Sequence, residues 1–147
     1  MKKIIFAILV IFVLPSLAFA AQDNVKQAEA LIADYVKKAK TTPSGLKYVV
    51  LHEGKGGKPA KGQSIDAHYV GRFMDGRIFD QSIGRAPFTF TVGVGQVIKA
   101  WDEALLDMKI GEKRAIIVPP ELGYGKRGAG KVIPPDSTLF FEVERLR

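Results

Sequence analysis

The chain has 147 residues, which is enough for one domain of ordinary size and too few for two. Its formal net charge is +7, but the basic residues are interspersed along the chain, so binding to nucleic acid is not expected. The absence of cysteine excludes disulfides, thiol catalysis and zinc sites with sulfur ligands. Neither His52 nor His68 has a partner at a metal-ligand spacing, so no metal is expected.

The first twenty residues have the layout of a secretory signal peptide. Lys2-Lys3 precede an unbroken apolar run from Ile4 to Leu14, and Ala18-Phe19-Ala20 supplies small residues where a signal peptidase reads the chain. We expect cleavage after Ala20, a signal peptide over residues 1–20 and a periplasmic location. The alternative is a retained membrane anchor, since residues 4–21 carry no charge and approach the length of a span. The central proline and the Ala-x-Ala end favour cleavage.

Residues 21–42 are expected to form a helical segment, with the helix itself over Gln22 to Thr41. Apolar residues recur in it at helical spacing from Val25 to Ala39, and Asn24 is expected to cap its start. A helix of about five turns is marginal alone in water, so it must pack on another surface. We expect it to dock on the following domain, and dimerisation through this helix is the alternative.

Residues 43–147 are expected to form one domain made mainly of strands. The Asp75-Gly76 dipeptide is a hairpin signal, and Val97 to Met108 has the periodicity of a helix that ends before Gly111. Strands are predicted over Leu46–His52, Gln63–Phe73, Arg77–Asp80, Pro87–Val92, Glu112–Val118 and Thr138–Leu146, with a long loop over Pro119–Asp136. The fold class is therefore α+β: a five- to six-stranded antiparallel sheet wrapped around one short helix, preceded by an N-terminal helix.

Motifs for nucleotide binding and nucleophilic catalysis fail on their context. Gly123 to Gly128 has the glycine spacing of a dinucleotide-binding loop, but Ile133-Pro134-Pro135 follows where a helix would have to begin. No serine lies in a nucleophile elbow, and nothing orients His68 as a base. No cofactor is expected.

The only tryptophan, Trp101, lies on the apolar face of the predicted Val97–Met108 helix. By periodicity alone, a large aromatic residue at such a position is more often core than active site. Its neighbours in the sequence change that interpretation.

Several spaced motifs resemble those of FKBP-type peptidyl-prolyl isomerases. They are Ala67-His68-Tyr69-Val70-Gly71, Gly76-Arg77-Ile78-Phe79-Asp80-Gln81-Ser82, Pro87-Phe88-Thr89-Phe90, Gly95-Gln96-Val97-Ile98-Lys99-Ala100-Trp101, Pro119-x-x-x-x-Tyr124-Gly125, Ile133-Pro134-Pro135 and Thr138-Leu139-x-Phe141-x-Val143-Glu144-x-Leu146. The resemblance covers residues 42–147. It implies a five-stranded sheet curled around a short helix, with a hydrophobic pocket between them.

The resemblance also implies a site and a set of partners. Trp101 would form the floor of a proline pocket, Asp80 would accept a hydrogen bond from Tyr69 and face the twisting amide, and the Ile98 N–H and the Tyr124 hydroxyl would bind substrate carbonyls. The residues implied as catalytic are Asp80, Tyr69, Phe79, Trp101, Tyr124 and Phe141, and those implied as substrate-binding are Phe88, Val97, Ile98, Ile133, Tyr69, Trp101 and Tyr124. The implied partners are proline-containing segments of unfolded exported proteins and macrolide-type inhibitors.

One loop departs from the family pattern. Where the family often has a histidine after the Tyr124 position, this chain has Gly128-Ala129-Gly130, so substrate preference is expected to differ. The rival functions are a module that binds proline-containing segments without isomerising them and a structural domain whose aromatic residues are only core.

Overall fold

The computed structural model describes residues 16–147, with side chains from residue 18 onward. In chain order the elements are α1 (Ser16–Lys38), β1 (Lys40–Thr41), β2 (Lys47–His52), β3 (Ser64–Phe73), β4 (Ile78–Gln81), β5 (Phe88–Thr91), α2 (Lys99–Asp107), β6 (Lys113–Val118), the 3-10 turn η1 (Pro120–Leu122) and β7 (Leu139–Arg145). The expected apolar run of the signal peptide, Ile4 to Leu14, lies outside the described residues.

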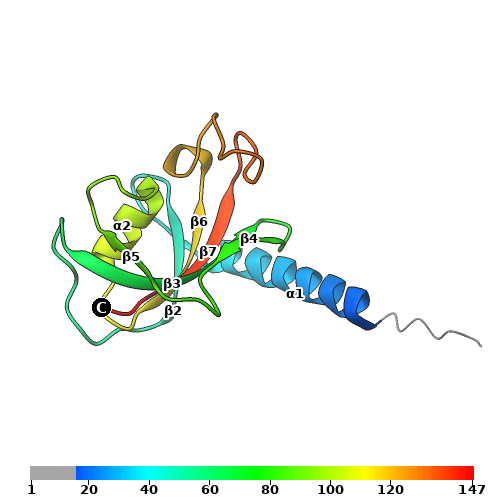
Figure 1. The fold of residues 1–147 in the computed structure, drawn as a ribbon, viewed down its shortest axis with the longest axis horizontal. Helices are drawn as coiled ribbons and strands as arrows, with labels where there is room; N and C mark the ends of the chain where they lie inside the picture. Colours follow the sequence, from blue (N-terminus) through cyan, green and yellow to red (C-terminus); the bar gives the residue numbers. More distant parts are fainter. Residues whose placement is uncertain (1–15) are drawn as a thin grey trace, which may run out of the picture.

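All the strands belong to one antiparallel sheet. Its order is β1-β2-β6-β7-β3-β4, and β5 pairs with the first half of β3. The sheet curves around α2, while α1 lies on the opposite side and extends away from the sheet (Figure 1). The predicted α+β architecture is confirmed. The sheet has one strand more than the six that the sequence predicts. This additional strand is β1, whose two residues are too few to produce a periodic pattern.

Alternation along β7 builds two hydrophobic cores, one on each face of the sheet. Leu139, Phe141 and Val143 face α2 and join the main core, as their period-2 spacing predicts. Phe140 points the other way and joins a second core with Ile32 of α1. One strand therefore supports both the α2 side and the α1 side.

The second half of α1 docks on the sheet. Ile32 is buried to 2% exposure, and the ring of Tyr35 stacks on that of Phe140 with centroids 6.1 Å apart. The first half of the helix covers the β3–β4 turn, where a side chain at Gly76 would collide with the α1 backbone at Val25. The expected docking of this helix is confirmed, and dimerisation remains a prediction.

The bounds of this first helix were predicted wrongly. Within the described residues it already runs from Ser16, ahead of the expected Gln22, because Ala18, Ala20 and Ala21 favour a helix. Asn24 is therefore in the helix interior and is not its cap. The helix ends at Lys38 because the next residues leave it to pair with β2.

The second helix, α2, is shorter than the range Val97 to Met108 over which apolar residues recur at helical spacing. Val97 and Ile98 share the periodicity of α2, yet Ile98 has an extended backbone with ψ 150°, and the helix begins at Lys99. It ends at Asp107 and not at Met108, whose backbone is also extended. Across residues 16–147, no helix has both the length and the apolar character needed to span a membrane.

Candidate active site

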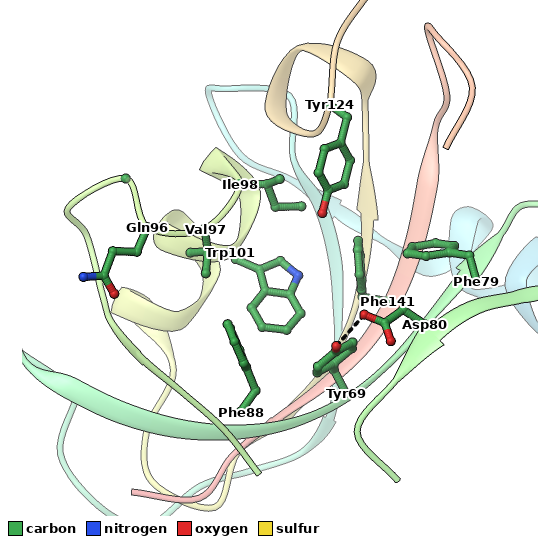
Figure 2. Close-up of a pocket in the computed structure, with 11 residues that line it drawn as sticks. Tyr69, Phe79, Asp80, Phe88, Gln96, Val97, Ile98, Trp101, Tyr124 and Phe141 are labelled. Carbon is green, nitrogen blue, oxygen red and sulfur yellow. Dashed lines mark hydrogen bonds between the residues drawn. The ribbon is translucent and has the colours of Figure 1, made fainter. Parts of the chain in front are cut away.

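A cavity of about 480 Å³ opens between the sheet and the start of α2. Its walls come from β3, β4, β5 and β7, from the turn before α2 and from the loop after β6 (Figure 2). The lining residues are Tyr69, Phe79, Asp80, Phe88, Gly95, Gln96, Val97, Ile98, Trp101, Tyr124 and Phe141. Eleven residues from distant parts of the sequence thus surround one mostly aromatic space.

Trp101 is at the centre of this aromatic set. The first turn of α2 holds it at 5% exposure, and its ring meets those of Tyr69 and Phe141 edge-on at centroid distances of 5.0 and 5.5 Å. Phe88 and Phe90 of β5 pack on it at 6.1 and 5.9 Å. The indole Nε1 is the only buried side-chain polar atom in the described part of the chain without a hydrogen-bond partner. Rings on several sides therefore pack against the indole and fix its orientation.

Asp80 is the one charged residue that lines the cavity, and its carboxylate is held by its neighbours. Oδ2 accepts a hydrogen bond from the hydroxyl of Tyr69 at 2.6 Å, as the resemblance implies (Figure 2). Oδ1 accepts from the backbone N–H of Gln81 at 2.8 Å and from the guanidinium of Arg85 at 3.3 Å. Burial, together with the hydrogen bond to Asp80, raises the pKa of Tyr69 to about 12. Tyr69 therefore remains a neutral donor throughout the physiological range.

Ser82 ties this pair of strands together behind the site. Its buried hydroxyl accepts a hydrogen bond from the backbone N–H of Tyr69 at 2.9 Å and lies 2.8 Å from Nδ1 of His68. These contacts continue the β3–β4 pairing past the end of β4. They hold Tyr69 and Asp80 at a fixed separation.

The turn before α2 is fixed by one carboxylate. Asp102 accepts hydrogen bonds from the backbone N–H groups of Gly93 and Gly95, at 2.7 and 2.9 Å. Both glycines have positive φ, 81° and 78°, which a residue with a side chain would adopt only with strain. Because this turn carries Val97 and Ile98, Asp102 sets the position of that wall without lining the cavity.

Ile98 offers a backbone donor at the start of α2. Its carbonyl oxygen accepts from the N–H groups of Trp101 and Asp102, at 3.0 and 3.2 Å. Its own N–H has no hydrogen-bond partner among the residues that the structure describes. As at other helix starts, such an N–H is available to an acceptor on a ligand.

Tyr124 enters the cavity from the loop after β6. Figure 2 shows its hydroxyl directed down toward the space above Trp101. The residue is 39% exposed, and partial burial with the nearby charge of Asp80 raises the pKa of its hydroxyl. The hydroxyl is therefore a neutral donor at the open side of the cavity.

A family model described as FKBP-type peptidyl-prolyl cis-trans isomerase matches residues 55–146. The chain belongs to this family. It is 54% identical over 98 residues to an FK506-binding protein of Neisseria meningitidis serogroup A, covering 66% of this chain and 90% of the relative. It is 48% identical over 101 residues to FK506-binding protein 1 of Dictyostelium discoideum, covering 68% of this chain and 94% of that protein. A crystal structure of AtFKBP13 shares the fold, with a TM-score of 0.71 and 43% identity over 74% of this chain and 97% of that one.

The FKBP-type assignment makes the chain a peptidyl-prolyl cis-trans isomerase and excludes the rival of a purely structural domain. Nine of the ten residues expected at its site lie together around the cavity, namely Tyr69, Phe79, Asp80, Phe88, Val97, Ile98, Trp101, Tyr124 and Phe141. The tenth, Ile133, is buried to 4% exposure in the main core and is not among the lining residues. Its part in substrate binding remains a prediction.

Two lining residues of the isomerase were absent from the expected site. Gly95 and Gln96 line the cavity through the turn that Asp102 holds. The side-chain oxygen of Gln96 accepts a hydrogen bond from the backbone N–H of Thr91 at 2.9 Å, which joins the turn to β5. The only feature of the sequence that could have placed them at the site is their position directly before Val97, because neither glycine nor glutamine by itself indicates a binding site.

Proposed function

We propose that the aromatic cavity is the place where this isomerase rotates X-Pro bonds. The observation that carries the proposal is the closure of six aromatic residues and one hydrogen-bonded carboxylate around a cavity large enough for a prolyl residue. We assign the isomerase domain to residues 43–147, and the proline ring to the face of Trp101.

Isomerisation demands little from the protein beyond binding the twisted amide better than the planar one. Rotation about an amide must cross about 18–20 kcal/mol because resonance is lost in the twisted state. The twisted amide has a smaller dipole than the planar amide. Transfer from water to an apolar cavity therefore destabilises the twisted amide less than the planar one, which lowers the barrier between them. Each tenfold gain in rate needs about 1.4 kcal/mol, so a few well-placed contacts are sufficient.

Three polar groups at the cavity have roles in this proposal. The free N–H of Ile98 donates to one substrate carbonyl, and the hydroxyl of Tyr124 donates to another. The carboxylate of Asp80 faces the twisting amide, and Tyr69 holds it there at 2.6 Å. The aromatic side chains of Phe79, Phe88 and Phe141 exclude water from the bond that rotates.

A protease-coupled assay on a proline-containing peptide tests the assignment. The purified protein should accelerate the slow cis-to-trans phase, and Asp80→Ala should lower the rate while the far-ultraviolet circular dichroism stays unchanged. Trp101→Leu should weaken peptide binding and lower the rate. Full activity in both variants would remove the catalytic role from this cavity, and binding without acceleration by the unaltered protein would favour a non-catalytic binding module.

We also propose that the isomerase acts on exported proteins in the periplasm. The support is the sequence from Met1 to Ala20, with its basic start, apolar run and Ala-x-Ala end. Expression in a Gram-negative host followed by osmotic shock should release a protein that has lost about twenty residues by mass spectrometry. Recovery of the full-length mass in the membrane fraction would favour the retained anchor instead.

A macrolide of the FK506 class is the proposed inhibitor. The relatives in Neisseria meningitidis and Dictyostelium discoideum carry the name FK506-binding protein, and the cavity here is aromatic and about 480 Å³ in volume. Because Trp101 is the only tryptophan, FK506 binding should change the intrinsic fluorescence, and Trp101→Leu should abolish that signal. Isomerase activity that persists at saturating FK506 would contradict this proposal.

A further inference from the structure

The loop after β6, which supplies Tyr124 to the cavity lining, also carries three basic residues. Lys126, Arg127 and Lys131, the rim cations, are all exposed. None of them lies within 4.0 Å of a carboxylate oxygen in the described part of the chain. Their charges are therefore available to a ligand that approaches the cavity.

The charge inside the cavity does not cancel that of the rim. Asp80 is the only charged lining residue, and it already faces the guanidinium of Arg85 at 3.3 Å. The same loop holds two exposed acidic residues, Glu121 and Asp136, against the three rim cations. This loop, which supplies Tyr124 to the cavity lining, consequently carries more positive than negative charge.

The rim cations are carried by an ordered loop. The N–H of Gly128 donates to the carbonyl oxygen of Tyr124 at 3.1 Å, which closes a turn around Lys126 and Arg127. The N–H of Ala129 donates to the carbonyl oxygen of Ile133 at 2.9 Å, which closes a second turn around Lys131.

One turn is anchored at the cavity and the other in the core. Tyr124 lines the cavity, and Ile133 is buried in the main core. Gly128 has φ 66°, and a side chain there would collide with the carbonyl oxygen of Ile133, so the two turns are packed against each other. The rim cations thus have a fixed base on the loop that supplies Tyr124 to the cavity lining.

We propose that the rim cations make this isomerase prefer prolines that have an acidic side chain within about two residues in the client chain. The inference rests on the proposed place of the proline ring above Trp101. An extended chain advances about 3.3–3.6 Å per residue, so a carboxylate two residues away is about 7 Å along the chain. A carboxylate at that reach is attracted by a rim cation with only partial screening wherever the two charges come within the Debye length of about 8 Å at physiological ionic strength.

The expected preference is moderate and depends on salt. Exposed charge pairs at such distances interact weakly in water, so we expect kcat/KM for a Glu-Pro peptide to exceed that for the matching Lys-Pro peptide about two- to fivefold. The ratio should fall toward one in 0.5 M NaCl, where the Debye length is only a few ångström. A Gln-Pro peptide should lie between the two.

The test uses three peptides, Ala-Glu-Pro-Phe, Ala-Gln-Pro-Phe and Ala-Lys-Pro-Phe, with isomerisation measured by NMR exchange so that no protease specificity intervenes. Peptide binding is followed in parallel by Trp101 fluorescence. The triple variant Lys126→Gln/Arg127→Gln/Lys131→Gln should bring the Glu-to-Lys ratio close to one. Its rate on the Gln peptide should be nearly unchanged.

A second triple variant controls for net charge. Lys26→Gln/Lys37→Gln/Lys47→Gln removes the same three charges from exposed positions on α1 and β2, and it should keep the preference. The inference would be overturned if the Glu-to-Lys ratio of kcat/KM were one in the unaltered protein, or if the rim variant kept a ratio above one. Turnover of the Gln peptide in the same experiments would show that the proposed isomerase site itself still stands. If no peptide were turned over, the proposed isomerase site would be contradicted instead. The ratio of binding affinities for the Glu and Lys peptides, measured by Trp101 fluorescence, would then still decide whether the rim cations select acidic segments.

Discussion

The hydroxyl of Tyr69 and the carboxylate of Asp80 face each other from adjacent strands at 2.6 Å, inside a cavity with no other charged residue in its lining. Burial and this hydrogen bond raise the pKa of Tyr69 from 10.0 to about 12. Between these two pH values the unfolded chain releases the proton and the folded protein keeps it. The stability contributed by this pair is therefore present below pH 10 and decreases as the pH rises toward 12.

The first prediction concerns Tyr69→Phe. This variant should lose the tyrosinate absorbance at 295 nm that appears near pH 12, and the decline in unfolding free energy between pH 10 and 12 should become shallower. It should also be less active at neutral pH, because Asp80 loses the donor that orients it. A difference titration with a midpoint near 10 would show that the hydrogen bond is not maintained in solution.

The second prediction concerns Asp102, which holds the turn that carries Val97 and Ile98. Asp102→Ala removes two charge-assisted hydrogen bonds from backbone N–H groups and should cost about 1–3 kcal/mol of unfolding free energy. KM for a proline peptide should rise by a larger factor than kcat falls, since the wall of the cavity is displaced while Asp80 remains in place.

Its matched control is the next residue. Glu103 accepts hydrogen bonds from the hydroxyls of Thr42 and Ser44, at 2.7 and 2.6 Å, away from the cavity. Glu103→Ala should reduce stability without raising KM. Equal KM values for the two variants would mean that Asp102 has only a structural role.

The third prediction concerns Gly71, which faces the cavity side of β3. A Cβ there would lie 2.7 Å from Cζ of Phe79 and 2.9 Å from Cε1 of Phe141, so both rings would have to move. Gly71→Ala should weaken FK506 or peptide binding at least tenfold and cost about 1–3 kcal/mol of stability. Gly57→Ala is the control, because nothing lies within 4 Å of its added methyl group. An unchanged affinity in Gly71→Ala would refute the packing described for the rings of Phe79 and Phe141.

The fourth prediction separates docking of α1 from catalysis. Ile32→Ala removes a side chain that is 2% exposed and should lower the unfolding free energy by about 2–5 kcal/mol. The neighbouring Leu31, which is 43% exposed, should tolerate the same substitution with a much smaller loss. Both variants should keep the isomerase kcat/KM at a temperature where they are folded, and similar chemical denaturation curves for the two would argue against docking in solution.

The sequence predicts the elements that depend on local periodicity. Alternation placed Leu139, Phe141 and Val143 on one face, and Asp75-Gly76 marked the turn where Gly76 has φ 91°. These signals are strong because burial on one face repeats every second residue, and because few residues other than glycine adopt positive φ.

Other features depend on contacts that no local pattern encodes. The helix α1 is present from Ser16 onward, ahead of the predicted start, because alanines are compatible with a helix and with a cleavage site alike. Gln96 lines the cavity through a turn set by the distant carboxylate of Asp102, and β1 exists only because β2 offers it an edge. Ile133 is in a motif that resembles the family, yet its burial is decided by how the loop after β6 folds back.

The central position of β7 has a consequence for the order in which the molecule can assemble. This strand pairs with β6 on one side and with β3 on the other, yet it comes last of all the strands in the chain. A chain that is still being synthesised thus cannot join the two halves of its sheet, or bring Phe141 to Trp101, until Leu139 to Arg145 has emerged. A chain truncated before Leu139 should lack cooperative thermal unfolding, whereas the full chain should show it.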